Sequence, residues 1–185
     1  MIERRELFKI FAATLVAARE GVAQHAHGSA AGVDVASYKP RFFTDQQYSV
    51  IDDVTEIIIP SDNESPGAHA AGVRFYIDTM LHYADPETQE RWRAGLAALE
   101  AGARAQFGRG CAECSAAEKA ELVALMARNE RAPATDLERF FPVLKNMTLD
   151  AFMMSEIGQK EYLGYKGNTA IQEFLGCTHP EHQRF

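Results

Sequence analysis

Two short groups of cysteine and histidine residues have types and spacings that can do chemistry. The first is the pair Cys111 and Cys114, separated by two residues and followed by a helix start signal at Ser115. A helix N-terminus lowers the pKa of a nearby thiol, which would suit thiol–disulfide exchange. The strand and helix pattern of a thioredoxin-like protein is absent from the sequence, however, and two cysteines supply only half of a zinc site. We therefore expect a structural disulfide or unmodified thiols here, rather than a redox or metal centre.

The second group is Cys177, His179 and His182. One thiolate and two imidazoles within six residues offer three zinc ligands, but no fourth ligand lies nearby in the sequence. We therefore assign no metal to the chain and treat these residues as weak candidates. The chain has three cysteines, so an oxidising compartment would leave one thiol without a partner inside the chain. In that compartment, we expect Cys177 to bond Cys111, Cys114 or a partner chain.

The rest of the sequence does not indicate catalysis. It holds no set of nucleophile, base and orienting residue, no glycine-rich loop after a strand and no cofactor fingerprint. The net charge of −7 on 185 residues, with scattered basic residues, argues against nucleic acid as a partner. We expect no activity from this chain alone. The alternative is a stand-alone periplasmic metal-binding or redox protein that uses Cys177, His179 and His182.

The first residues resemble a twin-arginine export signal. Arg4 and Arg5 precede a short apolar run over residues 10–18. This run is shorter than the roughly 20 residues that span a bilayer, so a transmembrane helix is not expected. We assign residues 1–31 to the signal, with an amphipathic N-terminal helix as the alternative, and residues 32–43 to a linker. The signal predicts a periplasmic protein.

Helix signals recur along residues 44–185, where we expect one domain. Asp85 followed by Pro86 is a helix start signal, and the helix that follows is expected to end at Gly108. Apolar residues at three- and four-residue spacing predict a helix over residues 68–83, with its core-facing side formed by Val73, Tyr76, Ile77, Met80 and Leu81. Pro142 is expected to kink or restart the last helix. No strand pattern is present, so we predict a compact all-α fold of about six helices with an irregular C-terminal arm. Three capping boxes, in which Ser or Thr precedes Gln or Glu by three residues, begin at Thr44, Ser115 and Thr135.

The stretch from Phe140 onward carries more aromatic and methionine residues than one buried helix face needs. Such surplus apolar surface indicates an interface that a partner covers. Side chains such as Phe152, Met153 and Met154 are expected to be exposed when the partner is absent. The predicted interface consists of Phe140, Phe141, Leu144, Leu149, Phe152, Met153, Met154, Ser155, Glu156 and Tyr165.

Two blocks of the sequence resemble a known family. The first runs from Ile58 to Asp62 and continues as Pro66-Gly67-Ala68, as Ala71-Gly72-Val73 and as Phe75, Ile77 and Asp78. The second includes Ser155-Glu156-Ile157-Gly158. Together with their surroundings, over about residues 44–177, they resemble the small (gamma) subunit of gluconate 2-dehydrogenase, the subunit 3 family. The series Ser155 to Gly158 is the most specific part, because generic helix packing does not require it.

The resemblance implies a non-catalytic subunit of a sugar or sugar-acid dehydrogenase. In that family the large subunit is an FAD enzyme of the glucose–methanol–choline type, and a cytochrome c with haem often receives the electrons. No cofactor is then expected in this chain. The small subunit commonly carries the twin-arginine signal and is exported together with the folded large subunit. The resemblance therefore implies that Arg4 and Arg5 serve both subunits, and that any membrane association runs through the complex.

Overall fold

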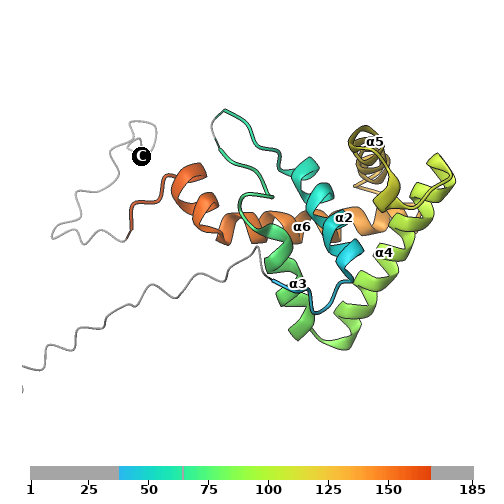
Figure 1. The fold of residues 1–185 in the computed structure, drawn as a ribbon, viewed down its shortest axis with the longest axis horizontal. Coiled ribbons are helices and arrows are strands. Elements are labelled where there is room, and N and C mark those ends of the chain that lie inside the picture. Colours follow the sequence, from blue (N-terminus) through green and yellow to red (C-terminus); the bar gives the residue numbers. More distant parts are fainter. Residues whose placement is uncertain (1–37, 64, 168–185) are drawn as a thin grey trace, which may run out of the picture. The chain divides into compact units, whose positions relative to one another are not determined.

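The computed structural model describes residues 38–63 and 65–167, all of which belong to the unit Ser37–Phe185. Arg4, Arg5, Cys177, His179 and His182, and with them the signal and the C-terminal arm, lie outside the described residues. Within those two ranges the chain is helical and has no strand, which confirms the all-α prediction. Figure 1 shows the helices, which are α2 (Asp45–Ile58), α3 (Val73–Tyr83), α4 (Pro86–Phe107), α5 (Ala116–Ala127) and α6 (Asp136–Met154), with a 3-10 turn η1 (Cys111–Glu113) and a π turn η2 (Gly158–Tyr162).

The predicted start signals set the first residues of α2, α4, α5 and α6. At α2, the Thr44 hydroxyl accepts a hydrogen bond from the Gln47 amide at 3.2 Å, and the Gln47 side chain accepts one from the Thr44 amide at 3.0 Å. The same reciprocal pair forms at Ser115 and at Thr135. Asp85 caps α4, with Pro86 as the first helical residue. All four start signals are thus confirmed.

Two predictions about helix bounds need correction. The helix expected over residues 68–83 begins only at Val73, because Gly72 takes a left-handed conformation with φ of 68° and residues 68–72 form a turn. Helix α6 runs without interruption through Pro142, so the predicted restart is absent. Proline inside a helix costs about 3 kcal/mol. Burial of Phe141 and Leu144, on either side of Pro142, offsets that cost by holding both parts of α6 in the core.

Helix α6 is the centre of the core and packs against α2, α3, α4 and α5. It packs tightly on α4 at Gly95, where a Cβ atom would lie 2.0 Å from the Phe140 ring. The Phe140 ring also meets the Trp92 ring edge-on, with 5.3 Å between the ring centroids. None of the described helices combines the length and apolar character needed to cross a bilayer.

A buried carboxylate fixes the segment that leads into α2. Asp78 on α3 is fully buried and accepts hydrogen bonds from the Tyr38 hydroxyl at 2.6 Å and from the Arg41 amide at 2.8 Å. It also accepts bonds from the amides of Phe42 and Phe43, at 3.1 and 2.9 Å. A buried carboxylate with this many donors is satisfied without a cation. Asp78 therefore ties residues 38–43 to α3.

Candidate functional site

The predicted interface divides into buried and outward-facing residues. Phe140, Phe141, Leu144 and Phe152 are buried in the core of the chain itself. The prediction that Phe152 is exposed without a partner is therefore wrong, since only 2% of it is accessible. Its ring is covered because α6 has neighbouring helices on several sides, so the buried part of its surface is wider than one helical stripe.

The remaining predicted residues lie at or near the surface. Met154 is 66% exposed, and Glu156 and Tyr165 are exposed as well. Leu149, Met153 and Ser155 are half-buried. The outward-facing part of the prediction thus concentrates at the C-terminal end of α6 and in the residues that follow it.

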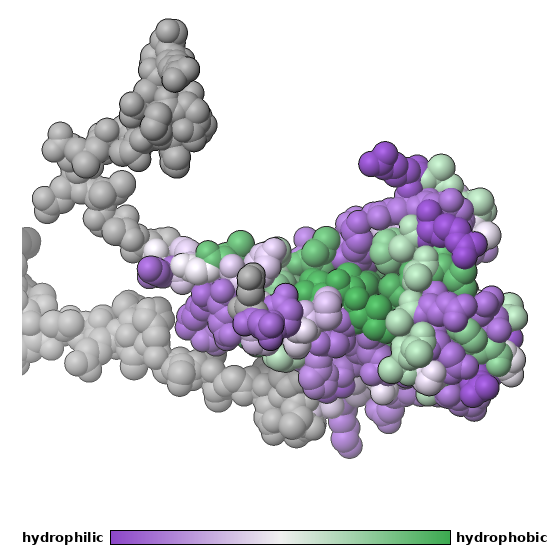
Figure 2. All heavy atoms as spheres, turned by 90° about the horizontal axis from the view of Figure 1, so that it is seen from above, coloured by the Kyte–Doolittle hydropathy of each residue, from purple (hydrophilic) through white to green (hydrophobic). Residues whose placement is uncertain are grey.

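Exposed large apolar side chains in the described part of the chain are confined to two segments. One is the second half of α3, and the other runs from the end of α6 to Tyr165. Tyr76, a half-buried residue nearer the start of α3, links the two segments, because its hydroxyl lies 3.6 Å from the Met154 sulfur. Figure 2 shows hydrophobic side chains open to solvent in the segment after α6. We call this surface the apolar ribbon; it consists of Tyr76, Met80, Tyr83, Met154, Tyr162, Leu163 and Tyr165.

The α3 side of the ribbon was not predicted from the sequence, although its signal was present. Tyr76, Met80 and Tyr83 follow one another at four and three residues, which places them on one face of a helix. We expected Tyr76 and Met80 to face the core. In the structure Met80 is exposed and Tyr76 is half-buried, while Ile77 and Leu81 face the core.

The Ser155 to Gly158 series builds the turn that displays one end of the ribbon. The Ser155 hydroxyl donates to the Phe152 carbonyl at 2.6 Å and accepts from the Gly158 amide at 2.9 Å. A Cβ atom on Gly158 would lie 2.0 Å from the Phe152 carbonyl oxygen, so only glycine fits there. The turn brings the Tyr162 ring against the Phe152 ring, with 5.9 Å between centroids. Ser155 and Gly158 thus shape the surface.

The other block of the resemblance forms a loop around one carboxylate. Glu56 accepts hydrogen bonds from the Ser61 amide and hydroxyl, both at 3.0 Å, and from the His69 amide at 2.7 Å. Gly67 is required because a Cβ atom there would lie 2.5 Å from the backbone nitrogen of Ser61, and equally close to the Glu56 carboxylate. The end of this loop and the turn after α6 line one open cavity of about 470 Å³, formed by Ala70, Ala71, Ser155, Glu156, Ile157, Lys160 and Glu161. The two blocks therefore lie side by side.

A histidine and an acid that the sequence analysis did not pair lie next to this loop. Asp52 on α2 is buried, and one of its oxygens lies 2.6 Å from His69 Nδ1 and 2.8 Å from an Arg74 nitrogen. His69 itself is 61% exposed at its side chain. The pair is 17 positions apart and joins a helix to a turn, so no local spacing indicates it. Asp52 thereby fixes the 68–72 turn and the start of α3.

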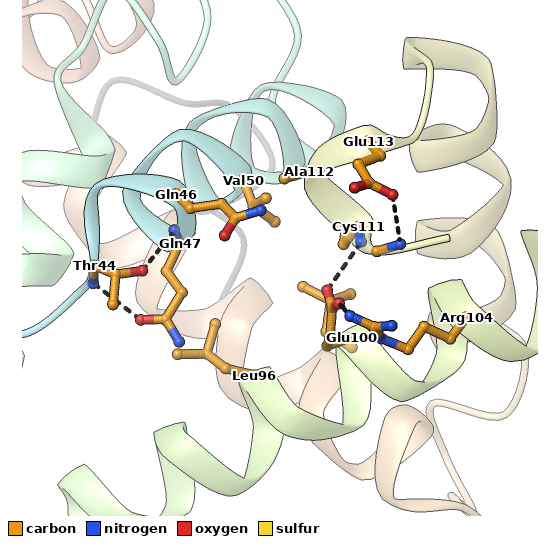
Figure 3. Close-up of a pocket in the computed structure, with 12 residues that line it drawn as sticks. Thr44, Gln46, Gln47, Val50, Leu96, Glu100, Arg104, Cys111, Ala112 and Glu113 are labelled. Carbon is orange, nitrogen blue, oxygen red and sulfur yellow. Dashed lines mark hydrogen bonds and ion pairs between the residues drawn. The ribbon is translucent and has the colours of Figure 1, made fainter. Parts of the chain in front are cut away.

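The two cysteines of the described part are buried, free thiols. Burial is the main cause that raises the pKa of Cys111 to about 11, and it also raises the pKa of Cys114. A raised pKa leaves little thiolate at neutral pH, which is the opposite of what thiol–disulfide exchange needs. Figure 3 shows Cys111 beside Glu100, whose carboxylate accepts a hydrogen bond from the Cys111 amide at 2.9 Å. Over residues 38–63 and 65–167, no three His, Cys, Asp or Glu side chains gather as a metal site.

The model of the family gluconate 2-dehydrogenase subunit 3 matches residues 45–169. This range contains both blocks on which the resemblance was based and all of the described helices. The resemblance seen in the sequence is therefore confirmed. No curated protein and no solved structure matches the chain.

Proposed function

The chain belongs to the gluconate 2-dehydrogenase subunit 3 family, and we propose that it is a non-catalytic small subunit which binds and stabilises a flavin-dependent dehydrogenase. The family name already places it in a dehydrogenase complex. We propose as its partner a large FAD subunit of the glucose–methanol–choline type that acts on a sugar or sugar acid. A cytochrome c with haem would be a further partner in the same complex.

The apolar ribbon is the observation that carries this proposal. Scattered surface hydrophobic residues are ordinary, but exposed Met, Tyr and Leu side chains confined to two touching segments mark an interaction site. Tyrosine and methionine are also enriched in the cores of protein interfaces. The turn after α6 is held by hydrogen bonds and has a position, Gly158, that only glycine can occupy. The ribbon is therefore a preformed surface. A preformed surface binds at a lower entropic cost.

We further propose that Arg4 and Arg5 direct export of both subunits to the periplasm. The large subunit would travel folded and bound to this chain, so the interface must form in the cytoplasm. The partner's stability before export would then depend on the small subunit.

Co-expression with the flavoprotein tests both parts. With the wild-type chain, we expect FAD-loaded large subunit and dehydrogenase activity in the periplasm. Replacing Arg4 and Arg5 by Lys should leave the assembled, active complex in the cytoplasm. Periplasmic activity from the double variant would contradict the export proposal alone. Full yield and export of active flavoprotein without this chain would contradict the subunit function as well.

A further inference from the structure

A second concave surface lies between α2, α4 and η1, and it shares no residue with the apolar ribbon. Figure 3 shows the side chains of Gln46 and Glu100 directed into it from α2 and α4. The cleft has a volume of about 380 Å³, which is at the lower end of the range for binding pockets. We call it the α2–α4 cleft.

The floor of the cleft is apolar. Val50 from α2, Leu96 and Leu99 from α4, and Cys111 from η1 line it and are all buried. The Cys111 thiol keeps its proton because burial raises its pKa to about 11, so it is a neutral part of that floor. The floor therefore suits the methylene groups of an incoming side chain.

Charged residues surround this floor. Glu100 is already used, since it accepts from the Cys111 amide at 2.9 Å and from Arg104 Nε at 3.0 Å. Glu113 has one weak contact, with the Gly110 amide at 3.4 Å. No cation of the described residues pairs with Glu113, which is exposed. The cleft thus carries one carboxylate whose charge is not balanced within the described chain.

This distribution of charge favours a basic occupant. An acidic side chain would be repelled by Glu100 and Glu113, and Arg104 is already paired with Glu100. A wholly apolar side chain would cover the Glu113 carboxylate without replacing its water, which is costly. A basic side chain satisfies both parts of the cleft, because Arg and Lys carry an apolar stem and a cationic end.

We propose that the α2–α4 cleft receives an Arg or Lys side chain of the flavoprotein, with its stem on the apolar floor and its charge at Glu113. The inference rests on the proposed subunit function and adds a second contact besides the ribbon. Arginine side chains in desolvated pockets are frequent anchors of protein interfaces. The interface would then reach from the ribbon on α3 and α6 to the side of α2 and α4 that Figure 3 shows.

Charge substitutions in the full-length chain test this inference. The dissociation constant of each variant for the purified FAD-loaded large subunit is measured by biolayer interferometry. Glu113→Lys should weaken binding at least tenfold, and Glu113→Gln should weaken it by a smaller factor. The matched control is Glu90→Lys, since Glu90 is also exposed but lies on α4 outside the cleft. It should bind like the wild type.

Salt dependence gives a second readout that misfolding would not imitate. Raising NaCl to about 0.5 M should weaken binding of the wild type more than binding of Glu113→Gln. The reason is that salt screens a charge pair that the wild type forms and the variant lacks. If Glu113→Lys binds like Glu90→Lys and the wild type, the cleft proposal is overturned while the subunit function stands. If the wild type does not bind the flavoprotein at all, both proposals fall.

Discussion

The hydroxyl of Tyr76 on α3 lies 3.6 Å from the sulfur of Met154, the last residue of α6. These residues are 78 positions apart; Met154 belongs to the exposed segment after α6, and Tyr76 is a half-buried residue of the helix that carries the other exposed segment. Their contact makes one surface out of two segments, and it lies beside the turn that Ser155 and Gly158 build. The most specific residues of the family pattern thus adjoin the surface that we assign to the partner.

Met154→Glu should abolish the contact that the Met154 side chain makes with the flavoprotein at the centre of this ribbon. Because Met154 is 66% exposed, the new carboxylate is solvated in the free subunit and the fold should be unaffected. In the complex the charge would be buried without a partner, so we expect at least tenfold weaker binding of the flavoprotein. The measurement is the dissociation constant, with the melting temperature of the free subunit recorded alongside.

The control for Met154→Glu is Ala101→Glu, which adds the same charge at an exposed position of α4 outside both proposed contacts. It should bind like the wild type. If the two variants bind the flavoprotein with equal affinity, Met154 is not part of the interface.

Asp78→Asn should destabilise the free subunit by about 2–4 kcal/mol. Asp78 accepts from the Tyr38 hydroxyl and from the amides of Arg41, Phe42 and Phe43. An asparagine has one acceptor oxygen, and its amide group would face other donors in a buried site. Urea unfolding measures the change, and Asp150→Asn at an exposed position of α6 is the control. If Asp78→Asn lowers the free energy of unfolding no more than Asp150→Asn does, residues 38–43 are held by other contacts.

Gly95→Ala tests the packing of α4 on α6. A Cβ atom would lie 2.0 Å from the Phe140 ring, so α4 and α6 must move apart or the ring must leave its position. We expect a loss of about 2 kcal/mol in the free energy of unfolding, although alanine is the better helix former. Gly102→Ala offers a milder comparison, since its Cβ would lie 2.9 Å from a flexible Leu137 methyl group. A stabilised Gly95→Ala variant would show that the two helices are not this close.

The raised pKa of Cys111 predicts a loss of stability at alkaline pH. The folded protein keeps the thiol proton up to about pH 11, whereas the ordinary value is 9.0. The stabilisation is therefore complete below about pH 9 and is lost as the pH rises to about 11, because the unfolded chain ionises first. Over that interval the wild type should lose roughly 2–3 kcal/mol more than Cys111→Ala. Parallel pH profiles of the two proteins in urea unfolding would contradict this assignment.

The helical fold could be predicted because its signals are local. Capping pairs such as Thr44 with Gln47 lie within one helical turn, and the stop at Gly108 also depends on a single residue. The later start of α3 could not be predicted, since the turn before it is held by Glu56 and Asp52 from another element. Local spacing does not record such contacts.

The interface was only partly predictable for a similar reason. Phe152 and Met154 have similar hydrophobicity and lie two residues apart, yet one is buried and the other exposed. Which of them faces solvent depends on where the neighbouring helices pack around α6. The roles of Ser155 and Gly158 in the turn also emerge only from the contacts they make with the backbone of Phe152.

Binding of the isolated, purified chain to its FAD-loaded large subunit tests the subunit function most directly. We predict a stable complex with one copy of each chain in size-exclusion chromatography with light scattering. The chain alone should show no sugar oxidation, and adding it should raise the melting temperature of the flavoprotein. Two separate peaks with an unchanged flavoprotein melting temperature would contradict the account.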